Sequence, residues 1–245
     1  MARKKRRNKG IVGQVGLGIM GGAFARHLIA DGFRVVGYDP SAKAVSAFKR
    51  VGGEPVSSPA EVARRARVII TSLPSPAAME AAYFGKEGIA AGAQRGTAVI
   101  EASTMTLELK ERIHRRLARQ GIKLLDCPIS GTGAQAAAKD IIVYASGDRA
   151  AYNRHRKVFD GFARGTYYCG EFGTGSKLKF VANLLVTIHN LSTAEAMVVG
   201  EKAGLDLDLL FRVIGDGAGA SRMFQVRGPL MVAGNYLPPH MKSEI

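Results

Sequence analysis

The sequence predicts an α/β protein in which a doubly wound parallel sheet is followed by a smaller, all-helical domain. Three observations support this prediction. Residues 11–39 have the pattern of a strand, a glycine-rich turn, a helix and a second strand. Short apolar runs then alternate with amphipathic helical stretches up to residue 172, which is typical of a parallel sheet. After residue 173 the pattern is almost entirely helical and starts with one long helix that joins the two domains.

The turn after the first strand carries the motif Gly16-Leu17-Gly18-Ile19-Met20-Gly21. Gly16 permits a tight turn, Gly18 leaves bare backbone for a pyrophosphate, and Gly21 lets the new helix lie close to its strand. The N-terminus of that helix adds unpaired N–H groups and a positive dipole end. We therefore expect these six residues to bind a dinucleotide in a Rossmann-type domain.

Asp39 follows the second strand, about 20 residues after the glycine motif, where an acid that binds the ribose of NAD is expected. A carboxylate at this position repels the 2′-phosphate of NADP, so NAD is the expected cofactor and NADP the less favoured one. Lys43 lies close enough in the sequence to moderate that preference. The alternative interpretation is that the glycines form only a turn and that Asp39, which precedes Pro40, opens the next turn.

Ligands of open α/β sheets lie at the carboxyl ends of the strands, so the loops that follow later strands are also candidates. The strand at 68–71 is broken by Leu73-Pro74, and the strand at 98–101 leaves Ser103-Thr104 at the same edge. We expect the Leu73-Pro74 turn to border the cofactor.

The strand around Leu124-Leu125 leads into a second loop of small residues, Asp126-Cys127-Pro128-Ile129-Ser130-Gly131-Thr132-Gly133. Its backbone N–H groups and the hydroxyl group of Ser130 could hold a carboxylate or a phosphate. The alternative is a plain Ser-Gly turn. Residues 141–145 and 166–169 are then predicted to be the closing strands.

Residues 176 to about 203 contain no proline and predict one helix of about 28 residues. Most of its circumference is apolar, and such a helix is expected to be buried. One stripe along it is polar and consists of Lys179, Asn183, Thr187 and Asn190. A buried lysine is costly unless an anionic group meets it, so Lys179 with Asn183 is the main site candidate outside the glycine loop. The alternative is a lysine that extends into solvent at the helix start.

Gly173-Thr174-Gly175 marks the predicted boundary between a dinucleotide-binding domain, residues 11–172, and a helical substrate or oligomerisation domain, residues 173–245. Shorter helices are predicted at 208–214 and around 221–230. These segments give little cover for so apolar a helix. We therefore expect another subunit to bury it, in a homodimer or a tetramer.

Residues 3–9 contribute six of the net charge of +15 and leave +9 for the rest of the chain. Lysines and arginines crowd positions 3–9 and repel one another, so residues 1–10 are predicted to be a disordered basic arm. Residues 3–9 could contact nucleic acid or an anionic surface, or the arm could be only a solvated tail. No aromatic-interleaved basic patch accompanies the remaining charge, so nucleic-acid binding is not expected elsewhere.

Composition narrows the class of protein further. No apolar run reaches the roughly 18 residues of a membrane span, and the N-terminus lacks the apolar region of a signal peptide. A soluble, cytoplasmic protein without a membrane partner is expected. Cys127 and Cys169 have neither metal-ligand spacing nor a disulfide pattern, so no metal site is predicted.

Three of these motifs together resemble those of the β-hydroxyacid dehydrogenases, the family of 3-hydroxyisobutyrate dehydrogenase, tartronate semialdehyde reductase and 6-phosphogluconate dehydrogenase. The segment 15–21 is similar to the cofactor signature, 126–133 to the substrate loop and 173–183 to the catalytic signature. They occur in the family's order over residues 11 to about 235.

The resemblance implies that Lys179 is the general acid/base and that Asn183 orients it or the substrate. The substrate carboxylate would be held by Ser130, Gly131 and Thr132. The residues lying against the nicotinamide ribose would be Leu73, Pro74 and Thr104. The implied reaction is the NAD-linked interconversion of a short 3-hydroxy acid and its aldehyde or keto acid (EC 1.1.1.-). A lysine can take the hydroxyl proton if desolvation lowers its pKa.

The sequence departs from the family pattern at several points. Thr132 stands where a glycine is usual and narrows the pocket, Ala182 replaces the first of two adjacent asparagines, and Gln14 falls in a strand that should be buried. We also expect the chain, which stops at Ile245, to lack the family's final helices and a Lys-Asp pair that helps to close the substrate site. The basic arm is not a family feature.

Two other functions fit the same scaffold. A non-catalytic member would bind a dinucleotide and use its arm on nucleic acid. Salt-sensitive DNA binding that is lost on removing residues 1–10, without turnover of any hydroxy acid, would identify it. An imine reductase would turn over cyclic imines but not aldehyde acids. The presence of Lys179 favours the dehydrogenase over both.

Overall fold

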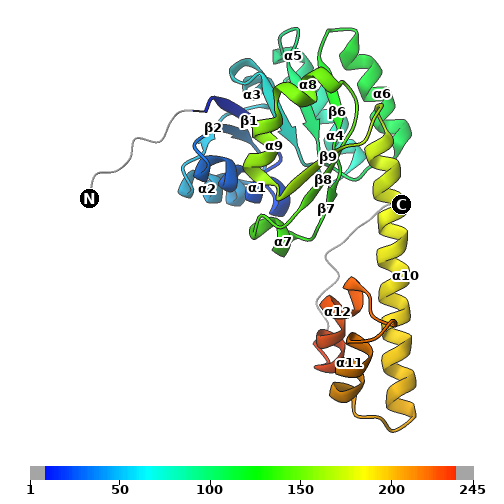
Figure 1. The fold of residues 1–245 in the computed structure, drawn as a ribbon. Helices are drawn as coiled ribbons and strands as arrows, with labels where there is room; N and C mark the ends of the chain where they lie inside the picture. The colour runs from blue at the N-terminus through cyan, green and yellow to red at the C-terminus, as the bar shows by residue number, and fades with distance from the viewer. Residues whose placement is uncertain (1–8, 236–245) are drawn as a thin grey trace. The chain divides into compact units, whose positions relative to one another are not determined.

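The computed structural model of the chain describes residues 9–235 (Figure 1). The predicted basic arm lies almost wholly outside the described residues, and so does the end of the chain after Asn235. Within the described part, no helix is both long and apolar enough to cross a membrane.

Six parallel strands form the main sheet, in the order β3-β2-β1-β4-β5-β6. The strands are β1 (Ile11–Val15), β2 (Arg34–Tyr38), β3 (Glu54–Pro55), β4 (Val68–Thr71), β5 (Ala98–Glu101) and β6 (Lys123–Asp126). The order reverses between β1 and β4, as in a dinucleotide-binding sheet. The predicted Rossmann-type, doubly wound sheet is confirmed.

Helices connect these strands and cover both faces of the sheet (Figure 1). They are α1 (Ile19–Ala30), α2 (Ala42–Arg50), α3 (Pro59–Arg65), α4 (Pro76–Phe84), α5 (Ile89–Gly92) and α6 (Leu107–Ala118). Because side chains alternate along a strand, Ile70 packs in the buried cluster that contains Phe24 of α1, and Ile69 packs in the cluster that contains Ile113 of α6. The strands are therefore apolar on both faces.

A second, three-stranded sheet follows, formed by β7 (Ile129–Ser130), β8 (Ile142–Ala145) and β9 (Gly165–Tyr168). The two strands predicted at 141–145 and 166–169 exist, but the prediction that they close the main sheet was wrong. The chain stays extended after β6, and Asp126 forms an antiparallel bridge with Ser146. β8 therefore runs back along this extension and pairs antiparallel with β7. The short helices here are α7 (Gly133–Ala137), α8 (Arg149–Arg154) and α9 (Arg156–Phe162).

The predicted long helix is confirmed as α10 (Thr174–Lys202), which is continuous over 29 residues. Two compact units meet inside it, the first reaching Lys179 and the second starting at Phe180. The described part of the second unit consists of the rest of α10, α11 (Leu207–Gly215) and α12 (Arg222–Val232). Its small core includes Met197 and Phe224, both at most 5% exposed.

A single chain leaves much of the apolar surface of α10 exposed, as expected from the little cover that the following segments give. Val181, Leu184 and Leu191 each expose 58% or 59% of their surface. Two short helices cover only part of its circumference, and Asn183, Thr193 and Met197 are its buried side chains in the second unit. An apolar circumference therefore did not imply burial within one subunit.

Candidate functional site

The glycine turn between β1 and α1 has no room for side chains at two of its positions. Gly16 has a φ of +87°, and a Cβ there would lie 2.1 Å from the carbonyl oxygen of Ser72. A Cβ on Gly21 would lie 2.0 Å from the carbonyl oxygen of Gly16. Both distances are far shorter than any real contact, so the turn depends on glycine at both positions.

Gly18 has a different reason to be glycine. It is the N-cap of α1, no side chain caps that helix, and a Cβ on Gly18 would meet nothing within 4 Å. The N-terminus of α1 therefore has no side-chain cap and has open space at Gly18. Amides at a helix N-terminus bind anions, so the residues present fit the pyrophosphate of a dinucleotide.

Gln14 stands out in the buried strand β1, and the structure gives it a role. Its side chain is fully buried, and Nε2 donates a 2.9 Å hydrogen bond to the carbonyl oxygen of Gly16. The side chain of Gln14 thus stabilises the glycine turn through a hydrogen bond from strand β1. What the sequence shows as a departure from the family pattern is a local support for the cofactor loop.

Asp39 contacts the glycine turn directly. Its Oδ2 accepts a 2.7 Å hydrogen bond from the backbone N–H of Leu17, and its Oδ1 accepts one of 2.8 Å from that of Ser41. The second bond is the turn-opening role that was the alternative interpretation. Each carboxylate oxygen has a second lone pair, so Asp39 can also accept hydrogen bonds from ribose hydroxyls.

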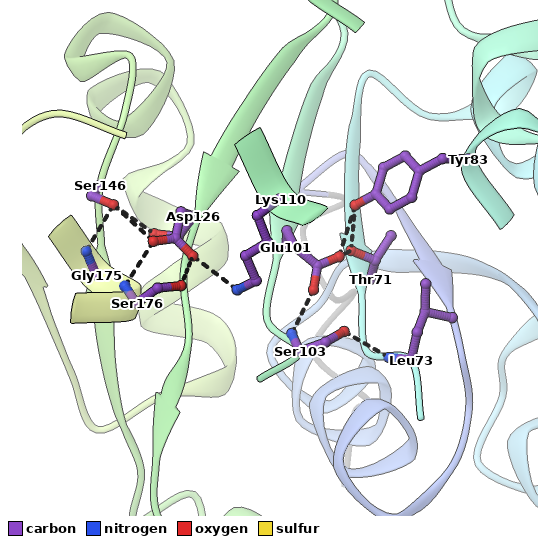
Figure 2. Close-up of polar contacts among 10 residues, drawn as sticks. All are labelled: Thr71, Leu73, Tyr83, Glu101, Ser103, Lys110, Asp126, Ser146, Gly175 and Ser176. Carbon is purple, nitrogen blue, oxygen red and sulfur yellow. Dashed lines mark hydrogen bonds and ion pairs between the residues drawn. The ribbon is translucent and has the colours of Figure 1, made fainter. Parts of the chain in front are cut away.

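A buried carboxylate on β5 ties together the two loops expected beside the nicotinamide ribose (Figure 2). Glu101 accepts hydrogen bonds from the backbone N–H of Ser103 (2.7 Å), from the hydroxyl group of Tyr83 (2.8 Å) and from that of Thr71. The Ser103 hydroxyl then accepts a 2.8 Å bond from the backbone N–H of Leu73. Burial raises the pKa of Tyr83 well above its usual range, so this phenol stays a donor.

The structure therefore places Leu73, Pro74 and Thr104 at one edge, although Pro74 is exposed and Thr104 half-buried. Glu101 and Tyr83 were not among the residues predicted from the sequence. A charge at the end of the otherwise apolar segment 98–101 was the available signal for Glu101.

The predicted substrate loop lies against the glycine turn, because a Cβ on Gly133 would be 2.5 Å from Cγ2 of Ile19. Ser130 is half-buried at the end of β7, and Gly131 has a φ of +144°. Thr132 caps α7: its hydroxyl oxygen accepts from the backbone N–H of Gln135, and its own N–H donates to Oε1 of Gln135. The residue that departs from the family pattern is thus engaged in a capping box, and a role for it in substrate binding stays a prediction.

A second buried carboxylate, Asp126 at the end of β6, holds the start of α10 (Figure 2). It accepts hydrogen bonds from the backbone N–H and the hydroxyl group of Ser176, at 2.7 and 2.8 Å. Lys110 of α6 forms a 2.9 Å ion pair with it, and neither side chain of this pair has any exposed surface. Asp126 was predicted only as part of the substrate loop, and Lys110 was not predicted from the sequence.

Lys179 follows Ser176 by three residues of α10 and lies in the first unit with the glycine turn. Its side chain is half-buried, so it is neither enclosed nor extended freely into solvent. Desolvation lowers the pKa of its amine below the usual value for a lysine. Asn183, one turn further along α10, is buried. The roles of both residues stay predictions.

Comparison with known proteins gives the geometry a context. Residues 11–170 match the family model of the NAD binding domain of 6-phosphogluconate dehydrogenase. Residues 173–244 match that of the NAD-binding region of NADP-dependent 3-hydroxyisobutyrate dehydrogenase. L-threonate dehydrogenase of Cupriavidus necator is 38% identical over 228 residues, which are 93% of this chain and 77% of that protein.

Solved structures agree with the sequence matches. The crystal structure of 3-hydroxyisobutyrate dehydrogenase from Salmonella typhimurium has a TM-score of 0.82 and 31% identity, covering 94% of this chain and 81% of its own. The Mycobacterium tuberculosis 3-hydroxyisobutyrate dehydrogenase, solved with L-serine, has a TM-score of 0.85 and 28% identity, covering 94% and 80%. The chain therefore belongs to the β-hydroxyacid dehydrogenases, a family of NAD(P)-dependent oxidoreductases.

Proposed function

We propose that this protein is an NAD-linked dehydrogenase or reductase that interconverts a short 3-hydroxy acid and its aldehyde or keto acid (EC 1.1.1.-). The observation that carries the proposal is Lys179, a half-buried amine with a lowered pKa on the anchored first turns of α10. A lysine in this state can exchange a proton near neutral pH more readily than a solvated one.

The cofactor residues proposed for this chain follow from the fit of the glycine turn. The amides of Gly18, Ile19 and Met20 would hold the pyrophosphate, with Leu17 and Asp39 at the ribose. The nicotinamide ribose would lie against the Leu73-Pro74 turn and Thr104. When bound, the dinucleotide supplies hydride transfer, and the protein supplies placement and charge.

The chain's own residues would bind the substrate and move its proton. Ser130 and Gly131, with Thr132 beside them, would hold the carboxylate. In the oxidation direction the neutral amine of Lys179 accepts the proton of the hydroxyl group. In the reduction direction its ammonium form polarises the carbonyl group and returns the proton. Asn183 would orient the amine or the substrate oxygen.

The substrate class is inferred from the relatives. They are named for L-threonate and 3-hydroxyisobutyrate, and one was solved with L-serine, all of which are small hydroxylated carboxylic acids. We infer the same class here. A screen of 3-hydroxy acids with NAD, followed at the absorbance of the reduced nicotinamide, identifies the substrate on which the variants below are compared.

Replacing Lys179 by alanine should lower turnover by at least about a hundredfold, the usual scale for loss of a positioned proton carrier. The dissociation constant of NADH should stay within about twofold, because the amine is not part of the proposed cofactor cradle. Lys177→Ala is the matched control, since Lys177 is an exposed lysine on the same turn region of α10. Wild-type turnover in Lys179→Ala would remove the lysine from the mechanism.

We also propose NAD rather than NADP, because the Asp39 carboxylate would face the site of a 2′-phosphate. Asp39→Asn keeps an oxygen for the Leu17 amide but removes the charge. The preference for NAD in kcat/KM should fall on the order of tenfold, since like charges near a surface repel by roughly 1–4 kcal/mol at about 4 Å. Asp160→Asn makes the same change in net charge at an exposed site on α9. An unchanged preference in Asp39→Asn would contradict this role.

The exposed apolar face of α10 supports a further part of the proposal, a homodimer or tetramer in which another subunit covers that face. Light scattering should give a mass of at least twice the 26.0 kDa of one chain. Leu184→Glu, which places a charge on the face, should lower that mass, whereas Tyr167→Glu at an exposed site on β9 should not. A monodisperse wild-type monomer would show that no such subunit is present.

A further inference from the structure

The Asp126 cluster, which consists of Asp126, Lys110, Ser146 and Ser176, contains a buried ion pair that the proposed reaction does not use (Figure 2). Asp126, Lys110, Ser146 and Ser176 are each at most 1% exposed. A buried ion pair is expensive to desolvate, and apolar residues of similar volume are often as stable. Stability alone therefore does not explain why the chain buries these charges, and we ask what else the cluster does.

Asp126 is fully buried, and its side chain is bonded to the other residues of the cluster. Oδ1 accepts from Lys110 Nζ at 2.9 Å and from the Ser176 hydroxyl at 2.8 Å. Oδ2 accepts from the Ser176 backbone N–H at 2.7 Å, and the Ser146 hydroxyl shares its one proton between Oδ2, at 3.3 Å, and the backbone carbonyl oxygen of Asp126, at 3.1 Å. Asp126 has no exposed surface and cannot contact a substrate, but two hydrogen bonds join it to Ser176 of α10.

A second contact holds the preceding residue. The backbone N–H of Gly175 donates a 3.0 Å hydrogen bond to the Ser146 hydroxyl, which itself bonds to Asp126. A Cβ on Gly175 would lie 2.3 Å from the carbonyl oxygen of Tyr144, so the start of α10 lies directly against β8. The helix cannot slide or rotate at its first turn without breaking several buried contacts.

Lys179 lies three residues beyond Ser176 on the same continuous helix, which is less than one full turn. If the first turn of α10 is rigid, fixing Ser176 also fixes the backbone of Lys179. Errors of about 1 Å in the placement of a reacting group can cost a hundredfold in rate.

We propose that Asp126, with its charge balanced by Lys110, is a positioning residue that sets Lys179 for proton transfer by fixing the first turn of α10. The inference deepens the proposed function and rests on Lys179 being the proton carrier. Asp126 itself touches neither substrate nor cofactor. Ser176 is the link between the carboxylate and the helix.

The first test removes the hydrogen bond from the Ser176 hydroxyl to Asp126 and leaves both charges of the cluster in place. Ser176→Ala should lower the single-turnover rate of hydride transfer by about tenfold, while KM for the hydroxy acid and the affinity for NAD change by less than about twofold. Ser58→Ala is the matched control, because Ser58 is also a buried serine at a helix start, where it caps α3. An unchanged rate in Ser176→Ala overturns the inference.

The second test separates positioning from stability with two double variants. Lys110→Met/Asp126→Asn and Lys110→Met/Asp126→Ala both remove the buried charges, but only the asparagine can still bond to Ser176. The asparagine variant should retain a rate within about threefold of wild type and the alanine variant should be at least about tenfold slower. Equal rates in the two folded double variants would contradict a positioning role; if the alanine variant does not fold, Ser176→Ala decides.

The outcomes also separate this inference from the proposed function. Absence of turnover by the wild-type protein on every hydroxy acid, or full turnover in Lys179→Ala, means that the proposed function fails. Turnover that depends on Lys179 but is unaffected by Ser176→Ala means that the proposed function stands and only the positioning role of Asp126 fails.

Discussion

The candidate site depends on two buried carboxylates that lie opposite each other on neighbouring strands, Glu101 on β5 and Asp126 on β6. Carboxylates without water are costly unless hydrogen bonds satisfy them. Here their bonds go to the loops that follow the strands. Glu101 fixes the loop of Ser103 and, through it, the Leu73 turn, whereas Asp126 fixes the start of α10 at Ser176. Because Glu101 and Asp126 occupy paired positions on neighbouring strands, the parallel sheet fixes the cofactor loops and the helix that carries the proposed proton carrier.

The candidate site combines closely packed segments with open or partly exposed ones. The glycine turn is packed so closely that Gly16 and Gly21 admit no side chain, yet it leaves open space at Gly18. α10 is held firmly at Ser176, yet Lys179, three residues later, is only half-buried. Such an arrangement suits an oxidoreductase in which a dinucleotide and a small acid must enter and leave, because the binding surfaces are fixed while the reacting groups stay accessible.

Much of this architecture could be predicted from local sequence chemistry. The glycine motif, the proline-free stretch of α10 and the alternation of strands and helices identify the sheet and the long helix. Contacts between distant residues could not be predicted in the same way. Nothing local pairs Lys110 with Asp126, and the pattern of residues 141–145 predicts a strand without saying which sheet it joins. The capping box of Thr132 and Gln135 had a local signal that the sequence analysis did not use. The apolar pattern of α10 did not show how much of the helix one chain buries, because such a pattern does not distinguish a core from a surface that is open to a partner.

The central claim is that the desolvated amine of Lys179 carries the proton in both directions, and the pH dependence of hydride transfer tests it most directly. Oxidation needs the neutral amine, so its rate should rise with pH and level off. Reduction needs the ammonium form, so its rate should fall through the same midpoint. Because desolvation lowers the pKa of Lys179, that midpoint should lie below about 10.4, the ordinary value for lysine. Profiles that do not mirror each other, or a shared midpoint at the ordinary lysine value, would contradict the account.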